Sequence, residues 1–306
     1  MKRLNFILSL LLVASSLLAA CAPAAPTTAA PQVFTDGLGR EVTLAAPAQR
    51  VVSMAPSITE ILYAVGAGGQ VIGRDEFSNY PADATALPSI GGSMGDYNYE
   101  QIVSLEPDLV LAAEINTPEQ VKALEDLGVT VYYLSNPTDM DGVYAMLQTV
   151  GDLTGHADEA SALVENLKAR VSAVEDKMAN VTTRPKVFYE LDGSDPAKPW
   201  TAGSGTFIDM LIQMAGGENV AASMEGAWGQ LSQEALLLAD PDFILLGDAA
   251  YGTTPEMVAA RPGWESLTAV KDGRILPFND DTVSRPGPRL VDALEELARL
   301  LHPEVQ

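Results

Sequence analysis

The sequence predicts an α/β protein with two αβ lobes, whose central sheets are mostly parallel, bridged by one long helix and separated by a cleft. Three observations favour this fold. Short β-branched runs alternate with helical stretches, as in parallel strands joined by crossover helices. One long helical stretch in the middle of the chain contains no Gly or Pro. The segments on its two sides repeat the same motifs in the same order, which indicates a duplicated unit.

The first residues have the features of an export signal. Lys2 and Arg3 precede an apolar run that is shorter than the roughly 20 residues of a transmembrane helix, and the run ends at small residues before Cys21. The next ten positions contain only Ala, Pro and Thr, a composition that buries too little apolar surface to fold. We therefore predict a signal peptide at residues 1–20 and a flexible linker, beginning with the lipidated cysteine, at residues 21–32.

The segment Leu18-Ala19-Ala20-Cys21 resembles the bacterial lipobox. The resemblance implies cleavage before Cys21, a lipid on its sulfur and a chain that is anchored to a membrane outside the cytoplasm. The alternatives are an uncleaved anchor and an ordinary signal peptide with a chance cysteine. Because Cys21 is the only cysteine of the chain, we expect no disulfide.

The N-terminal lobe is predicted to span residues 33–154. Ser57 and Glu60 have the spacing of a capping box and are expected to begin a helix. The other elements are read from apolar β-branched runs and from helical periodicity. The predicted strands are 51–54, 71–73, 108–112 and 129–133, with a helix at 118–127 between the last two.

A linking helix is predicted at residues 155–183, because apolar residues recur there at intervals of three and four and charges fill the other face. The C-terminal lobe then covers residues 184–306. Its expected elements follow the same reasoning. They are strands at 186–191, 243–246 and 274–278, a turn at 203–206 that opens a helix, and a closing helix at 289–301.

Two matches support the duplication. Glu100 lies seven residues before Pro107, and Glu234 lies seven residues before Pro241; an Asp and an apolar strand follow each proline. Upstream of each unit the chain repeats a helix, a glycine turn and a strand. Two duplicated lobes placed face to face create a cleft between them.

The composition excludes several kinds of partner. A net charge of −23 argues against nucleic acid and anionic lipid surfaces, which need clustered Lys and Arg. The chain has two histidines, His156 and His302, which are far apart, so we expect no metal site of the protein's own. We also expect a monomer with no resident cofactor.

The order of several motifs resembles the periplasmic binding proteins that serve importers of vitamin B12, ferric siderophores and haem. The similar segments are FTDGLGREVT at 34–43, RVVSMAPSITEIL at 50–62, Tyr80-Pro81, Gly91-Gly92, the two Pro-Asp units, AGGEN at 215–219 and SRPGPR at 284–289. The resemblance implies two lobes joined by a rigid helix, a transport function outside the cytoplasm and a partner that is an ABC permease dimer with its ATPase subunits. It also implies that Glu100 and Glu234 dock on arginine pockets of the permease. The alternative is that both are helix N-terminal acids favoured by the macrodipole.

The predicted ligand is a large metal chelate, either cobalamin or another corrinoid or a ferric siderophore. Aromatic rings offer flat apolar area to such a ligand, and one arginine offers a charge. The predicted ligand-binding residues are Phe77, Tyr80, Met94, Tyr97, Trp200, Trp228, Tyr251, Asp281 and Arg285. Positions that are aromatic in B12 carriers are here Met94, Ala113 and Leu191, so a siderophore stays open as the ligand. Haem is the alternative, and it is disfavoured because no histidine and no clearly placed tyrosine stands out as an axial ligand.

A secreted hydrolase that uses paired carboxylates is a less favoured alternative, because nothing places two of the acids across one pocket. The sequence has no Gly-x-Ser-x-Gly elbow, and the glycines at 203–205 lack the lysine of a P-loop. We therefore predict no catalytic residues and no enzyme activity.

Overall fold

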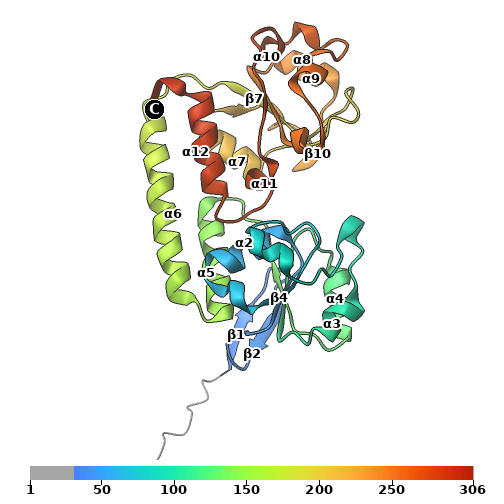
Figure 1. The fold of residues 1–306 in the computed structure, drawn as a ribbon. Coiled ribbons are helices and arrows are strands. Elements are labelled where there is room, and N and C mark those ends of the chain that lie inside the picture. The colour runs from blue at the N-terminus through green and yellow to red at the C-terminus, as the bar shows by residue number, and fades with distance from the viewer. Residues whose placement is uncertain (1–30, 306) are drawn as a thin grey trace, which may run out of the picture.

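The computed structural model describes residues 31–305. The predicted signal peptide, the lipidated Cys21 and most of the predicted linker lie outside these residues. Strand β1 (Gln32–Thr35) begins at the last residue of that predicted linker. Figure 1 shows two lobes, one above the other, with helix α6 (Ala157–Met178) running along one side of both.

The N-terminal lobe contains a parallel four-stranded sheet of order β4-β3-β5-β6. Its strands are short and almost entirely buried because helices and loops cover both faces. The strands are β3 (Val51–Ser53), β4 (Val71–Arg74), β5 (Leu109–Ala113) and β6 (Val131–Leu134). The helices are α2 (Pro56–Ala64), α3 (Tyr99–Ser104), α4 (Pro118–Asp126) and α5 (Met140–Thr154). An antiparallel pair of β1 and β2 (Glu41–Leu44) is added at the lower end.

The C-terminal lobe contains a second parallel four-stranded sheet, of order β12-β11-β7-β9. Its strands are β7 (Lys186–Glu190), β9 (Glu218–Asn219), β11 (Phe243–Leu246) and β12 (Ile275–Pro277). The helices are α7 (Phe207–Met214), α8 (Gln233–Ala239), α9 (Pro255–Ala259), α10 (Thr268–Lys271), α11 (Asp280–Val283) and α12 (Leu290–Leu301). Strands β8 (Trp200–Ala202) and β10 (Trp228–Gln230) form a separate antiparallel pair.

The two sheets have the same topology. In each lobe the spatial order of the strands, counted along the chain, is second, first, third, fourth. The Pro-Asp units make equivalent contacts: Asp108 accepts a hydrogen bond from the backbone N–H of Arg50 at 3.0 Å, and Asp242 accepts one from Lys186 at 2.8 Å. Each aspartate therefore fixes the start of the first strand of its lobe, and the predicted duplication is present in three dimensions.

The backbone repeats an uncommon conformation at the same place. Glu106 and Asp240, which precede the two prolines, have positive φ angles of 49° and 46°. Few residues other than glycine adopt this region. Its occurrence at corresponding positions strengthens the case for duplication.

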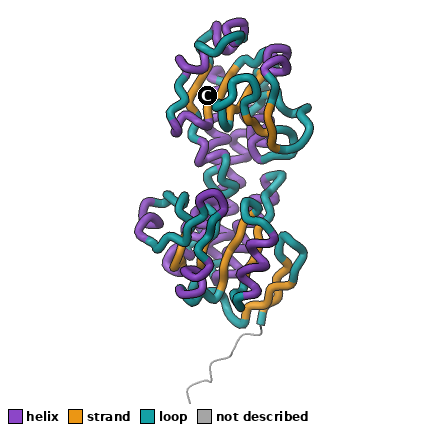
Figure 2. The backbone as a smooth tube through the Cα atoms, turned by 90° about the vertical axis from the view of Figure 1, so that its right-hand side faces the viewer, coloured by secondary structure: helices purple, strands orange, loops and turns teal. Residues whose placement is uncertain are grey.

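Helix α6 connects the two lobes. It packs on α5 of the N-terminal lobe and on α7 and α12 of the C-terminal lobe. Its buried residues recur every three or four positions, at Ala160, Val164, Leu167, Val171 and Val174. They belong to an apolar cluster that is continuous from one lobe to the other. Figure 2, which is turned by 90° from Figure 1, also shows the two lobes as separate bodies.

Two details of the sequence prediction were wrong. Helix α6 is shorter than residues 155–183, because it begins after His156 and ends before the segment that leads to Pro185. The capping box of Ser57 and Glu60 does not form. Helix α2 begins at Pro56, and its N-cap Ala55 makes no side-chain hydrogen bond, so both residues lie inside the helix. Proline at the first helical position explains the start of this helix.

Candidate ligand-binding cleft

A cleft of about 1060 Å³ lies between the lobes. Its walls come from segments that follow β3, β4 and β5 in the N-terminal lobe and β7, β11 and β12 in the C-terminal lobe. The cleft therefore lies at the carboxyl ends of both parallel sheets, which is where ligands bind in open α/β folds. Its volume is at the upper end of the range of small-molecule pockets, about 300–1,000 Å³, and indicates a large ligand.

Aromatic side chains line both walls. Phe77 and Tyr97 come from the N-terminal lobe, and Phe207, Trp228 and Tyr251 from the C-terminal lobe. The ring of Trp228 packs on that of Phe207 with centroids 5.4 Å apart, and Trp228 keeps 41% of its surface exposed. The cleft thus offers flat apolar surface from two directions.

Two carboxylates lie in the walls, and Asp75 is buried whereas Asp280 is half-buried. Asp75 accepts hydrogen bonds from the Ser78 hydroxyl and from the Phe77 backbone N–H, the latter at 2.9 Å. Asp280 accepts from the Tyr189 hydroxyl at 2.8 Å and from the Ser284 hydroxyl at 2.5 Å, all at its Oδ1 atom. Burial raises the pKa of Asp75 and the pKa of Asp280, because desolvation penalises the charged form.

The phenol of Tyr97 is held by polar contacts. Its hydroxyl donates to the Met54 carbonyl at 3.0 Å and accepts from the Asn116 amide at 2.8 Å. Burial raises the pKa of Tyr97 to about 12. Tyr97 therefore lines the cleft as a neutral side chain whose hydroxyl is held in place.

Glu60 connects the lobes. Its carboxylate, in α2 of the N-terminal lobe, accepts from Arg285 Nη1 at 2.9 Å and from Arg289 Nε at 2.7 Å, both from the C-terminal lobe. The Glu60 side chain is 1% exposed. We call Glu60, Arg285 and Arg289 the interlobe bridge. Ion pairs between a buried carboxylate and two guanidinium groups are costly to break. Removal of one partner leaves the other as an uncompensated buried charge.

The bridge continues into the cleft wall. Arg285 also pairs with Asp281 at 2.6 Å, and it donates to Asn79 Oδ1 at 2.7 Å. Asn79 donates in turn to Asp281 Oδ2 at 3.2 Å. The guanidinium of Arg285 is therefore bound by two carboxylates and lies at the edge of the cleft.

The predicted ligand-binding residues fall into three groups. Six line the cleft: Phe77, Tyr97, Trp228, Tyr251, Asp281 and Arg285. Tyr80 and Trp200 are outside its lining. The Tyr80 ring instead stacks under the Arg289 guanidinium at 4.2 Å. Met94 belongs to a short 3-10 helix, Ser93–Gly95, and its side chain lies outside the described part of the structure.

Trp200 and Trp228 lie on the paired strands β8 and β10, which were not among the predicted strands. Ala113 and Leu191, where B12 carriers were expected to have aromatic residues, both line the cleft. Their smaller side chains leave more room for a ligand at these points.

The sequence prediction missed Glu60 and the two wall aspartates, Asp75 and Asp280. One signal for Glu60 was available. It lies in a helix whose neighbours Ile58, Ile61 and Leu62 are apolar, and a carboxylate buried on such a helix needs a cationic partner. Two arginines four residues apart, at 285 and 289, are suitable partners. Asp75 and Asp280 carry no comparable local signal.

Glu100 and Glu234 occupy equivalent places on the two lobes. Each is the second residue of a short helix, and each is exposed. Asn98 caps the first helix by accepting from the Gln101 N–H at 2.9 Å, and Ser232 caps the second by accepting from the Ala235 N–H at 3.2 Å. The matched caps give the two carboxylates the same local geometry.

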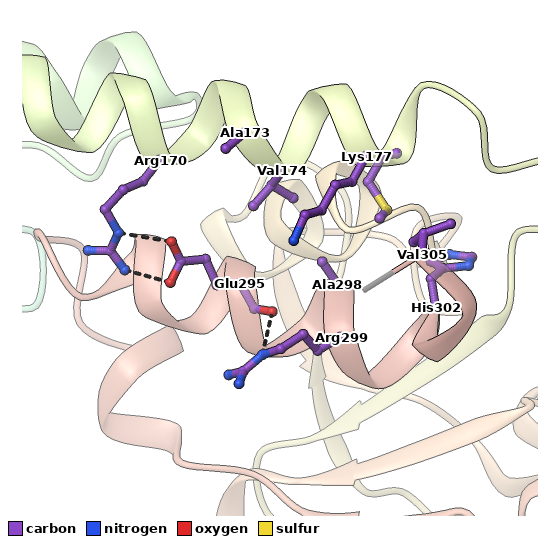
Figure 3. A pocket seen from close by; sticks show the side chains of 10 residues that line it. Arg170, Ala173, Val174, Lys177, Glu295, Ala298, Arg299, His302 and Val305 are labelled. Atoms are coloured by element: carbon purple, nitrogen blue, oxygen red, sulfur yellow. Dashed lines mark hydrogen bonds and ion pairs between the residues drawn. The ribbon is translucent and has the colours of Figure 1, made fainter.

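A second, smaller cavity of about 290 Å³ lies between α6 and α12 (Figure 3). Arg170 crosses it and binds Glu295 through two hydrogen bonds of 2.9 and 2.8 Å. These hydrogen bonds lower the pKa of Glu295. The cavity is lined by charges of both signs and lies outside the interlobe cleft, so we regard it as a packing gap beside the linking helix.

Metal ligands and membrane spans were sought in residues 31–305. No group of three or more His, Cys, Asp or Glu side chains in this range is arranged to hold a metal ion. No helix in the same range is both long enough and apolar enough to cross a bilayer.

Relatives in sequence and structure agree with this architecture. The chain is 30% identical over 316 aligned positions to an uncharacterized ABC transporter substrate-binding lipoprotein, YvrC, of Bacillus subtilis, and the alignment covers 99% of each. It is 32% identical to a cobalamin-binding protein of Halobacterium salinarum, over 89% of this chain and 74% of that one.

Two solved structures have the same fold. The periplasmic haem-binding protein RhuT of Roseiflexus sp. RS-1 matches with a TM-score of 0.75 and 30% identity, over 84% of this chain and 99% of that chain. The vitamin B12 binding protein BtuF of Vibrio cholerae matches with a TM-score of 0.72 and 27% identity, over 84% and 98%. The model of one family matches residues 51–281, which include both parallel four-stranded sheets and most of the residues that line the cleft. The chain belongs to the periplasmic binding protein family.

Proposed function

We propose that this protein is the extracytoplasmic substrate-binding component of an ABC importer and that it carries a large metal chelate, a corrinoid or a ferric siderophore, to the permease. The observation that carries the proposal is the interlobe cleft of about 1060 Å³ with aromatic side chains on both walls. Its size and flat apolar surfaces suit a macrocycle or a bulky chelate. The cobalamin-binding and B12-binding relatives support the corrinoid.

The proposed partner is a permease dimer with its ATPase subunits. Glu100 and Glu234 are exposed on equivalent helices of two lobes, so they suit a partner with two-fold symmetry. Charge-assisted pairs with arginine would fix the register of docking more than they would add affinity. We also propose that the protein acts as a monomer and is anchored through a lipid on Cys21.

Haem is a second candidate, because the haem-binding relative RhuT shares the fold at 30% identity and because Tyr251 lines the cleft with 87% of its surface exposed. A tyrosine phenolate is one of the known axial ligands of haem iron. Binding through Tyr251 predicts a haem absorbance spectrum that changes in the variant Tyr251→Phe. A corrinoid or siderophore carrier predicts no such spectrum.

A thermal-shift screen tests the proposal. The full-length mature chain is heated with cobalamin, cobinamide, haem and several ferric siderophores, since a ligand that binds only the folded state raises the melting temperature with concentration. We expect a concentration-dependent rise with one chelate class, together with quenching of Trp fluorescence and no turnover of the ligand. The absence of a shift with all of them contradicts the chelate proposal, and chemical conversion of the ligand favours an enzyme instead.

A further inference from the structure

The cleft carries a marked excess of negative charge. The described residues that line it include five carboxylates and one guanidinium. The carboxylates are Asp75, Glu76, Glu114, Asp280 and Asp281, and the guanidinium is that of Arg285. The whole chain adds a field of the same sign, with a net charge of −23.

The cleft keeps an excess of negative charge even if its less exposed carboxylates are neutral. Desolvation raises the pKa of Asp75 and of Asp280, which favours the neutral form of these two carboxylates. Three carboxylates remain even when both are neutral, because five less two leaves Glu76, Glu114 and Asp281. Glu76 and Glu114 are exposed side chains in contact with the cleft solvent.

The lining guanidinium does not balance this charge. Arg285 pairs with Glu60 at 2.9 Å and with Asp281 at 2.6 Å, and its side chain is 11% exposed. Its positive charge is thus already opposed by two carboxylates, one of which, Glu60, adds to the five that line the cleft. An anionic ligand would meet acceptor oxygens on both walls. Among the described lining residues, no guanidinium is left unpaired to bind it.

We propose that the cleft selects a neutral or cationic metal chelate that presents hydrogen-bond donors such as amide N–H groups, and rejects an anionic chelate of similar size. This inference rests on the proposed function and adds the charge class of the ligand. Carboxylates on the rim accept hydrogen bonds from amide donors, and the aromatic walls contact the flat apolar part of the chelate. Carboxylate or catecholate groups on the ligand would be repelled, since they bring like charges together in a partly desolvated site.

Matched ligands test the charge dependence. Dicyanocobinamide keeps the side-chain amides of the corrin ring, whereas dicyanocobyrinic acid carries carboxylates at the same places. A second pair is ferrioxamine B, with a free ammonium group, and its succinylated derivative. We expect at least about tenfold tighter binding of the amide or ammonium member of whichever pair binds, equivalent to about 1.4 kcal/mol, by titration calorimetry at low salt. The preference should shrink as ionic strength rises.

Two variants locate the effect. The double substitution Glu76→Gln/Glu114→Gln removes two exposed charges from the cleft. Glu114 accepts a hydrogen bond from the Asn136 backbone N–H at 2.8 Å, and the amide oxygen of a glutamine at this position can accept the same hydrogen bond. We expect the charge preference to fall at least about threefold. The control Glu218→Gln/Glu265→Gln removes the same charge from exposed positions outside the cleft lining and should leave the preference unchanged.

The outcomes separate this inference from the proposed function. Equal or tighter binding of the anionic member, or a preference that the cleft variant leaves intact, overturns the charge inference and leaves the carrier proposal standing. Failure of every corrinoid, siderophore and haem probe to bind overturns the proposed function, and the charge inference with it.

Discussion

The two lobes share a core and differ in what extends from it. Both have the same strand order, the same aspartate contact at the start of the first strand and the same positive φ angle before proline. The cleft is built differently on each side. The N-terminal wall uses the segment that includes Asp75 and Phe77, and the C-terminal wall uses strand β10 with Trp228 and helix α11 with Asp281. The duplicated part thus provides the scaffold and the proposed docking points, and the unduplicated part provides the proposed ligand site.

The largest effect is expected where the lobes are equivalent. The double substitution Glu100→Arg/Glu234→Arg places cations where the proposed permease pockets need carboxylates. We expect uptake of the chelate in cells to fall to background while its dissociation constant stays within about twofold, because both residues are outside the cleft lining. Each single substitution should reduce uptake only in part if both lobes dock.

The structure offers a close control for this test. Glu119 and Glu256 are also exposed glutamates at the second position of short helices, one in each lobe. Glu119→Arg/Glu256→Arg therefore reverses the same charge at the start of one short helix in each lobe. Full uptake in this control and none in the docking variant supports docking. Loss of uptake in both would show that reversal of any such charge is harmful, and full uptake in both would remove the docking role.

Two buried glutamates allow ion pairing between the lobes to be compared with ion pairing within one lobe. Glu60 binds Arg285 and Arg289 across the lobes, whereas Glu190 binds Arg261 at 2.9 Å within the C-terminal lobe. Both glutamates are buried. We expect Glu60→Gln and Glu190→Gln each to lower the free energy of unfolding by about 3–5 kcal/mol, measured by denaturant titration.

The two variants should differ in shape. Glu60→Gln releases a contact between lobes, so we expect a larger radius of gyration by solution X-ray scattering, and Glu190→Gln should leave that radius unchanged. Glu295→Gln is the control, because it weakens the exposed pair with Arg170 and should cost less than about 1 kcal/mol. An unchanged radius in Glu60→Gln would mean that helix α6 and its apolar contacts alone set the lobe spacing.

The sequence was sufficient to predict the repeated scaffold because its signals are local. The alternation of strands and helices, the Pro-Asp units and the linking helix all depend on patterns within about 10–30 residues. The parallel sheets and their common topology follow those patterns. Helix α5 (Met140–Thr154), which packs beside α6, was missed although it is amphipathic.

The cleft was less predictable because its key contacts are distant along the chain. Glu60 and Arg285 are 225 positions apart, and no periodicity within either segment relates them. Strands β8 and β10 have three residues each, too few for an alternating pattern to be recognised. Six of the nine predicted ligand-binding residues nevertheless line the cleft, since aromatic residues in Gly- and Pro-rich segments tend to lie at the ends of strands. Their role in binding stays a prediction.

Trp228 and Trp200 give a matched pair on neighbouring strands. Both are about equally exposed, at 41% and 44%, but only Trp228 lines the cleft within the described residues. We expect Trp228→Ala to weaken chelate binding by about 1.5–3 kcal/mol, or more than tenfold, because an aromatic contact with the ligand is lost. Trp200→Ala should change affinity by less than about threefold. Equal losses in both would place the ligand over the outer face of the strand pair instead of in the cleft.

The smallest effect concerns Asp75 and Asp280, one aspartate on each wall of the cleft. Burial raises the folded-state pKa of Asp280 above its unfolded value, so its contribution to stability is present below that value and is lost as pH rises through the folded pKa. Asp280→Asn removes this loss, and both donors to Oδ1 can still bind the amide oxygen. We expect the variant to gain up to about 1 kcal/mol relative to the wild type between pH 4 and pH 7, measured by chemical denaturation.

The pKa of Asp75 is shifted in the same direction as that of Asp280, but the two asparagine variants should differ in stability. Its two donors, the Ser78 hydroxyl and the Phe77 N–H, bind different carboxylate oxygens, so an asparagine must present its NH₂ group to one of them. Asp75→Asn should therefore flatten the pH dependence as Asp280→Asn does, but with a constant loss of about 1–3 kcal/mol for an unsatisfied buried donor. Measuring both from pH 4 to pH 7 separates the two terms, since the charge term varies with pH and the hydrogen-bond term does not. A pH profile that neither variant alters would show that the walls stay hydrated enough to keep both carboxylates charged at little cost, and both would then add to the negative charge of the cleft.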